Sequence, residues 1–154
     1  GLVLLVPLVD INGELWNLQR IFTDGRKMFM PGGRITGCFA LLADELPATG
    51  TLYICEGFAT AASIHQASGL PVVAAMNAGN LKPVAVAIRE ARPALEIIIA
   101  ADNDHLTAGN PGRTKGQDAA AAIGAAMTWP TVCLQGDCRC TDFNDTLNCE
   151  KNNA

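Results

Sequence analysis

The fold is decided by two similar stretches, LYICEG at residues 52–57 and IIIAADND at residues 97–104. Each stretch is a short apolar run that ends in carboxylates, and such runs predict strands buried on both faces of a parallel sheet. Open α/β sheets bind ligands beyond the carboxyl ends of their strands, so we expect Glu56, Asp102 and Asp104 to meet at one edge. Because neighbouring carboxylates repel each other unless a cation lies between them, the pattern predicts a divalent-metal site.

The composition indicates a packed globular protein. The chain has 154 residues, of which 49% are hydrophobic, enough for one ordinary domain or a small domain with an appendage. The net charge of −4 argues against a surface coated with basic residues, although a local basic patch is compatible with it. The apolar run at residues 2–6 is too short to cross a bilayer and lacks a basic lead-in, so we expect no membrane association and a cytoplasmic location. Because Gly1 rather than Met opens the chain, we expect a piece of a longer protein.

Two of the six cysteines, Cys38 and Cys55, lie inside apolar runs and are expected to be reduced core residues. The other four gather near the end of the chain, at Cys133, Cys138, Cys140 and Cys149. Their spacing does not match the paired Cys-x-x-Cys pattern of common zinc sites. We therefore expect ordinary cytosolic thiols, with a zinc site as the less favoured alternative.

Residues 1–45 are expected to form a small antiparallel β meander. Apolar runs at 4–8 and 14–22 flank a turn that contains Asn-Gly, the strongest short signal for a hairpin. Further strands are expected at 26–30 and 38–43. The meander carries Arg20, Lys27 and Arg34. These residues predict a surface that contacts nucleic-acid phosphates, and a solvated polar face is the alternative.

Residues 51–149 are expected to form an α/β domain, after a linker at 44–50. Strands are predicted at 51–55, 71–75, 95–101 and 131–134. Helices are predicted at 58–68, from Asn80 as the cap to Pro93, from a capping box at Thr114 to Met127, and at 142–149. Strands that alternate with helices predict a mostly parallel sheet of about four strands flanked by helices. Residues 150–154 are expected to be a disordered tail.

The acidic residues have structural as well as functional explanations. Asp102 and Asp104 lie two residues apart, so in an extended segment both can face one cation, and Mg²⁺ accepts one or two carboxylates together with water and phosphate. A turn or a helix cap is the alternative role. Glu56 could simply favour a helix dipole, while Gly57 would allow a ligand to approach the backbone.

A loop at residues 109–115 follows the acidic pair and leads into a predicted helix. Free N–H groups and the dipole at a helix start favour phosphate, and Arg113 and Lys115 could neutralise its charge. The alternative is that both are solvated loop residues. His105 adjoins the acids and is a candidate minor ligand.

Together these residues resemble a known family. Glu56-Gly57 followed by Asp102-x-Asp104 at the end of a later strand resembles the Toprim catalytic domain shared by primases, topoisomerases and some nucleases. The fuller pattern resembles the Toprim region of phage- and plasmid-encoded primases, at residues 56–63, 77–81, 101–104, 109–112 and 142–145. The segments 7–19 and 30–34 also resemble the region upstream of Toprim in those proteins, so the resemblance spans nearly the whole chain.

The resemblance implies a Rossmann-like Toprim fold and a set of site residues. Glu56, Asp102 and Asp104 would be catalytic and would hold Mg²⁺ or Mn²⁺, with Asp142 and Asp145 near the metal. Cellular replicative primases carry an Asp four residues after the Glu, where this chain has Thr60. One acid fewer makes a second metal a weaker expectation.

The resemblance further implies the catalytic core of a mobile-element DNA primase. Such a core joins nucleoside triphosphates into RNA primers on a single-stranded DNA template, with a replicative helicase domain in the same polypeptide as a partner. A Toprim nuclease is one alternative, because the same acids serve both directions of phosphoryl transfer. A non-catalytic module that binds nucleic acid or nucleotide is the other.

Overall fold

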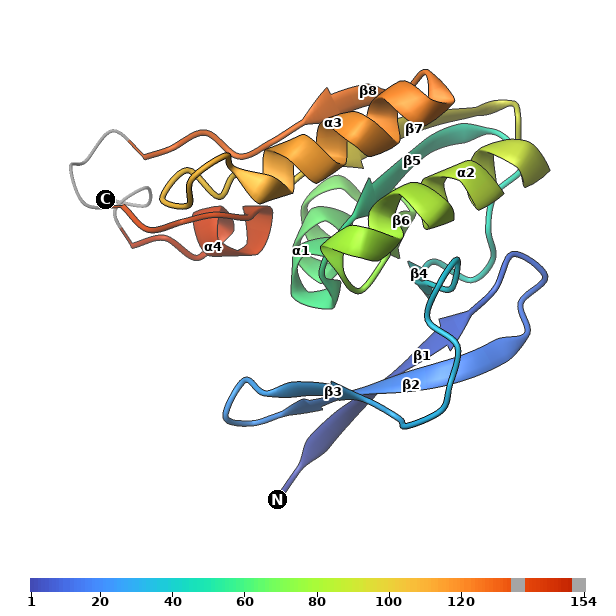
Figure 1. Cartoon of the computed structure of the whole chain (residues 1–154), viewed down its shortest axis with the longest axis horizontal. Helices are drawn as coiled ribbons and strands as arrows, with labels where there is room; N and C mark the ends of the chain where they lie inside the picture. Colours follow the sequence, from blue (N-terminus) through green and yellow to red (C-terminus); the bar gives the residue numbers. More distant parts are fainter. Residues whose placement is uncertain (134–137, 151–154) are drawn as a thin grey trace.

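The computed structural model describes residues 1–133 and 138–150, which form two sheets and the helices that cover the larger one (Figure 1). The smaller sheet has the order β1-β2-β3 and is antiparallel. Its strands are β1 (Val3–Val9), β2 (Leu15–Phe22) and β3 (Lys27–Phe29). This is the antiparallel meander that the Asn-Gly turn predicts.

The larger sheet has the order β4-β6-β5-β7-β8. Its strands are β4 (Ala40–Leu42), β5 (Gly50–Cys55), β6 (Val72–Ala74), β7 (Leu95–Ala100) and β8 (Ala126–Thr128). The pairs β6-β5, β5-β7 and β7-β8 are parallel, and β4 is antiparallel to β6. The predicted fold class, a mostly parallel α/β sheet after a small antiparallel sheet, is confirmed.

Two details of the strand prediction are wrong. The strand expected at 38–43 forms as β4 but pairs with β6, so the larger sheet has five strands rather than about four. The last strand of the described residues is β8; of the strand expected at 131–134, residues 131–133 lie in no strand and residue 134 lies outside the described residues. β8 starts early because Gly124 adopts a left-handed φ of 62° and ends the preceding helix before Met127. The chain then enters the sheet at Ala126, beside Ile98.

Four α-helices and one 3-10 turn complete the described part of the chain. They are α1 (Phe58–Ser68), η1 (Ala78–Asn80), α2 (Leu81–Ala91), α3 (Pro111–Ile123) and α4 (Phe143–Leu147). The predicted capping box at Thr114 is wrong, because α3 begins at Pro111, a residue suited to the first helical position. Asn110 caps this helix by accepting a hydrogen bond from the Arg113 N–H. None of the described helices is long and apolar enough to cross a bilayer.

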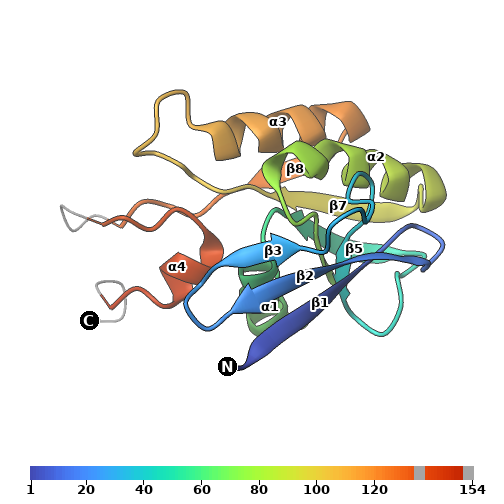
Figure 2. The ribbon, with the colours of Figure 1, turned by 60° about the horizontal axis from the view of Figure 1, so that its bottom comes forward.

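The two faces of the larger sheet bury different layers, as Figure 2 shows with α2 and α3 above the sheet and α1 with the small sheet below it. Leu52 and Ile54 of β5 belong to the core shared with α2 and α3. Cys55 belongs to the opposite core with Ile64 of α1, and Leu8 of the small sheet enters the same core. Both sheets therefore share a hydrophobic layer, which fixes the meander beside the α/β domain.

Asn80 has a different role from the predicted helix cap. Its side chain is buried and accepts a hydrogen bond from the Gly37 N–H at 2.7 Å, while its amide nitrogen donates to the carbonyl oxygens of Ile35, Cys38 and Ala75 at 2.8–3.1 Å. The capping oxygen comes instead from Asn77, which accepts from the Asn80 N–H. Asn80 thus ties the connection between the two sheets to the end of β6.

This difference between the two asparagines gives a stability prediction. Asn80→Ala leaves several buried backbone groups without partners and should lower the free energy of unfolding by about 3 kcal/mol. Asn77→Ala removes one cap and should cost about 1 kcal/mol. Urea unfolding followed by circular dichroism measures the free energy of unfolding of both variants. Equal losses of stability would contradict the linking role assigned to the Asn80 side chain.

Candidate metal and nucleotide site

Glu56 lies at the carboxyl end of β5, where the chain turns into α1. Its backbone is fixed from the neighbouring strand, because the Met76 N–H donates to the Glu56 carbonyl at 2.6 Å. Met76 is a non-glycine residue with a left-handed φ of 74°, a conformation that persists where the surrounding structure enforces it. The turn after β6 therefore sets the position from which the Glu56 side chain leaves the sheet.

The second group of acids follows β7, the strand beside β5. Cys55 and Ala100 are paired in register, so Glu56 and Asp102 leave the same edge of the sheet. Between the acids, Asn103 is buried, and its side chain donates to the Pro130 carbonyl and accepts from the Asn110 side chain. Since alternate residues of an extended segment point to opposite sides, the buried Asn103 leaves Asp102 and Asp104 on the other side.

The charges of the acids interact strongly. Burial, followed by the charge of Asp104, raises the pKa of Glu56. Burial raises the pKa of Asp102 to about 8, and the negative charges of Glu56, Asp142 and Asp104 add to the shift. The structure thus brings together three predicted site acids and a fourth, Asp142, from far along the chain.

The residues fit a bound cation. Asp102 Oδ1 is buried and makes no hydrogen bond to any residue that the structure describes. A buried carboxylate oxygen without a donor, among three other acids, would gain a partner from a metal ion bound there. In residues 1–133 and 138–150, no three of these carboxylates have oxygen atoms all within 4.8 Å of one another. A Mg²⁺ ion bound here would therefore take few of these carboxylates directly and retain several waters.

Asp142 and Asp145 have different surroundings. Asp145 Oδ2 accepts hydrogen bonds from the N–H and hydroxyl groups of Thr141, so its carboxylate is used locally. Asp142 caps α4 with one oxygen, Oδ1, and its charge also raises the pKa of Asp102. Ser63 of α1 donates to the Asn144 side chain at 2.9 Å, which holds α4 beside the site. Of the two predicted metal neighbours, Asp142 is therefore the one directed to the acids.

The predicted basic residues fall into three groups. Lys27 of β3 lies close enough to Glu56 for its charge to lower that pKa. The three arginines lie over aromatic rings, with Arg20 on Phe22, Arg34 on Trp16 and Arg113 on Trp129, at 5.9, 5.1 and 4.1 Å from the ring centres. Lys115 is exposed on α3. Among these cations, Lys27 is the one whose charge reaches the acid site.

Gly112 is a site residue whose role the sequence alone did not reveal. Its N–H donates to Asp104 Oδ2 at 2.8 Å, and a Cβ atom there would lie 2.8 Å from Asp102 Cβ, Asp102 O and Asp104 Oδ2. The start of α3 can approach the acidic pair only because this position lacks a side chain. His105, the candidate minor ligand, instead contacts the Cys140 carbonyl through Nε2 at 3.2 Å.

With this geometry in view, comparison with known proteins identifies the family. The Toprim domain family matches residues 51–152. The chain belongs to the Toprim domain family. Two curated proteins named DNA primase TraC from Escherichia coli are similar to this Toprim chain, at 42% and 40% identity over 131 residues. Each match covers 81% of the chain but only 12% and 9% of the relative, so the chain spans about a tenth of their length.

Solved structures support the Toprim fold. The primase fragment of the bacteriophage T7 primase-helicase protein matches with a TM-score of 0.65 and 19% identity, over 93% of this chain and 56% of that one. The second structure contains the T7 lagging-strand DNA polymerase with primase domains bound to an RNA/DNA hybrid and dTTP. It matches with a TM-score of 0.64 and 20% identity, over 96% of this chain and 71% of that one.

The raised pKa of Asp102 predicts a pH dependence in metal-free buffer. The folded state retains a proton that the unfolded state releases above its ordinary pKa of about 3.9. Stability should therefore fall by up to about 1.4 kcal/mol per pH unit as the pH rises from about 4 to about 8. Asp102→Asn should flatten most of this slope, leaving the part due to the raised pKa of Glu56, and Mg²⁺ should restore stability to the wild type at about pH 8.

Urea unfolding with and without chelator measures the slope. Asp118→Asn, at an exposed position of α3, is the matched control and should keep it. Parallel pH profiles for the wild type and Asp102→Asn would contradict a buried, proton-retaining Asp102.

A second prediction concerns Gly112. Gly112→Ala forces a methyl group against the Asp102 backbone and should weaken Mn²⁺ binding by about tenfold or more, as replacing residues behind metal ligands commonly does. Isothermal titration calorimetry measures the affinity, and circular dichroism checks the fold. Thr114→Ala, in the same helical turn, should bind as the wild type does. Unchanged Mn²⁺ affinity in Gly112→Ala would show that this close approach does not set the acid geometry.

Proposed function

We propose that this Toprim domain is the metal-dependent catalytic core of a DNA primase that joins nucleoside triphosphates into RNA primers on single-stranded DNA. The observation that carries the proposal is the buried, unpartnered Asp102 oxygen among carboxylates from three separate segments. The primase names of the two curated relatives reported above support the reaction class.

Each site residue has a role in this proposal. Glu56, Asp102 and Asp104, with Asp142 nearby, would hold Mg²⁺ or Mn²⁺. When bound, the metal would supply positive charge to the triphosphate and favour ionisation of the attacking hydroxyl. Lys27, whose charge reaches Glu56, would hold phosphate oxygens at the opening of the site. Asp145 would act by holding Thr141 and the start of α4.

Arginine and tryptophan pairs on the surface favour a single-stranded template as the partner. Trp16 and Trp129 are 39% and 37% exposed, and each has an arginine over its ring, Arg34 and Arg113 respectively. Exposed aromatic rings stack on unpaired bases, and neighbouring arginines attract the phosphates between them. The half-buried Arg20 and the exposed Lys115 would each add positive charge near their own part of the surface.

The wider partners also belong to the proposal. One T7 neighbour is a fragment of a primase-helicase protein, which supports a replicative helicase domain in the same polypeptide as this one. A cytoplasmic location fits work on replicating DNA.

Primer synthesis tests the function. The chain is grafted in place of the matching segment of a TraC primase, because the chain itself covers about a tenth of that protein. Radiolabelled nucleotide incorporation on a single-stranded template should occur with the wild-type graft and fall at least about 100-fold in Asp102→Ala. The Asp118→Ala graft should stay active. An Asp102→Ala graft that synthesises primers at the wild-type rate would contradict the proposal.

A cleavage assay on the isolated chain, set beside primer synthesis by the graft, distinguishes a primase from a nuclease. End-labelled linear DNA is incubated with Mg²⁺ and the isolated chain, then resolved by length. Cleavage that depends on Asp102, without primer synthesis by the graft, would assign the acids to a nuclease instead. The proposal predicts intact DNA.

A further inference from the structure

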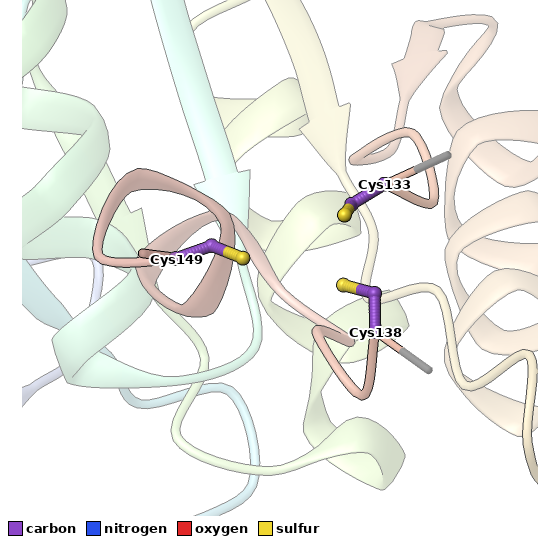
Figure 3. A group of neighbouring side chains, drawn as sticks. All are labelled: Cys133, Cys138 and Cys149. Carbon is purple, nitrogen blue, oxygen red and sulfur yellow. The ribbon is translucent and has the colours of Figure 1, made fainter. Parts of the chain in front are cut away.

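Four cysteines that the acid site does not use gather at the far end of the chain. Cys133 follows β8, Cys138 and Cys140 precede α4, and Cys149 follows it. The sulfur atoms of Cys133, Cys138 and Cys149 all lie within 4.8 Å of one another. Figure 3 shows the three side chains coming from separate segments with their sulfur atoms directed to a common centre. The irregular spacing in the sequence conceals this arrangement.

From this cluster we infer a structural zinc site in which the thiolates of Cys133, Cys138 and Cys149 bind one ion and Cys140 supplies the fourth sulfur. Tetrahedral thiolates about 2.3 Å from zinc lie about 3.8 Å apart, so a small contraction of the cluster suffices. All four sulfurs are softer ligands than the carboxylates of the acid site, which selects Zn²⁺ over Mg²⁺ here.

The hydrogen bonding of the thiols supports this inference. Hydrogen bonds from the backbone and side chain of Cys140 lower the pKa of Cys138 to about 7. The hydrogen bond between these two thiols raises the pKa of Cys140 to about 12, and Cys149 contributes to that shift. Cys140 lies outside the three sulfurs that are all within 4.8 Å of one another, and its thiol donates to the Asp145 carbonyl at 3.6 Å, so its sulfur would turn toward the cluster when zinc binds. Metal binding would release the remaining thiol protons to solvent.

The fold gives such an ion a structural purpose. Helix α4 has five residues, none of them fully buried, and its packing rests on the half-buried Phe143 and the hydrogen bond between Ser63 and Asn144. The segment from Cys133 to Cys149 nevertheless carries Asp142 to the acid site. An ion joining the two ends of this segment would close it into a loop and hold Asp142 in position.

Zinc affinity measured by competition with a chromophoric chelator, on reduced protein, tests the site. The wild type should bind one equivalent and, loaded with Co²⁺, show the visible spectrum of tetrahedral thiolate ligation. Cys133→Ser, Cys138→Ser and Cys149→Ser should each weaken zinc binding about 100-fold or more, beyond the about 10- to 100-fold typical of residues behind the ligands. Cys38→Ala, which also removes one thiol, should bind as the wild type does.

Two further variants make the assignment specific. Cys140→Ser should also weaken binding about 100-fold and alter the cobalt spectrum, and a loss of only about tenfold or none would overturn its place as the fourth ligand. Asp102→Asn should retain full zinc affinity, which separates this site from the acid site whatever reaction the latter performs. Wild-type protein that binds no zinc would overturn the inference, as would Cys149→Ser binding as tightly as Cys38→Ala. A Cys133–Cys138 disulfide that forms in excess zinc would also overturn it.

Discussion

The repulsion between half-buried carboxylates at the edge of the larger sheet is the constraint on which the site depends. Glu56 and Asp102 lie close enough for a side-chain hydrogen bond. Burial is the largest cause of the raised pKa of each group; the charge of Glu56 raises the pKa of Asp102 further, whereas the hydrogen bond with Asp102 lowers the pKa of Glu56. Without a cation, at least one of them retains a proton near neutral pH. With a cation, both can ionise and the unpartnered Asp102 oxygen gains a ligand. Metal affinity and local stability are therefore two consequences of one arrangement.

The fold supplies that arrangement through parallel register. Pairing of Cys55 with Ala100 brings two acidic turns to one edge, the buried Asn103 orients Asp102 and Asp104, and Gly112 lets α3 approach them. The small sheet adds Lys27, because its apolar face shares a core with α1. The acid site thus draws on both sheets. A division at residue 45 would separate β4 from the larger sheet in which it pairs, and Lys27 from Glu56.

The parallel strands and their acidic edge could be predicted from the sequence, since apolar runs that end in acids are typical of buried parallel strands. Residues 52–57 and 97–104 were sufficient for β5, β7 and their shared edge. What the sequence could not reveal depends on contacts between distant segments. Asn80 is of a residue type common at helix caps, but its hydrogen-bond partners at residues 35–38 come close to it only in the folded chain. The alternation around Asn103 was a readable signal that it faces inward.

The same distinction applies to the ends of elements and to the cysteines. The capping-box pattern at Thr114 and Gln117 was misleading because Pro111 and Asn110 start α3 earlier. Asp142 and Asp145 look equivalent in the sequence, yet only the Asp145 carboxylate accepts a hydrogen bond from Thr141, which gives the two acids different roles. The cysteine spacing matches no familiar motif because Cys149 reaches the cluster only after α4 has reversed the chain.

The most direct test is anomalous diffraction from crystals of the chain soaked in Mn²⁺. The account predicts a manganese peak between the Glu56 and Asp102 carboxylates, about 2.0–2.3 Å from their nearest oxygens, with Asp102 Oδ1 among the ligands. It also predicts the loss of that peak in Asp102→Asn crystals. Full manganese occupancy elsewhere, with the Asp102 oxygen still lacking a partner, would contradict it.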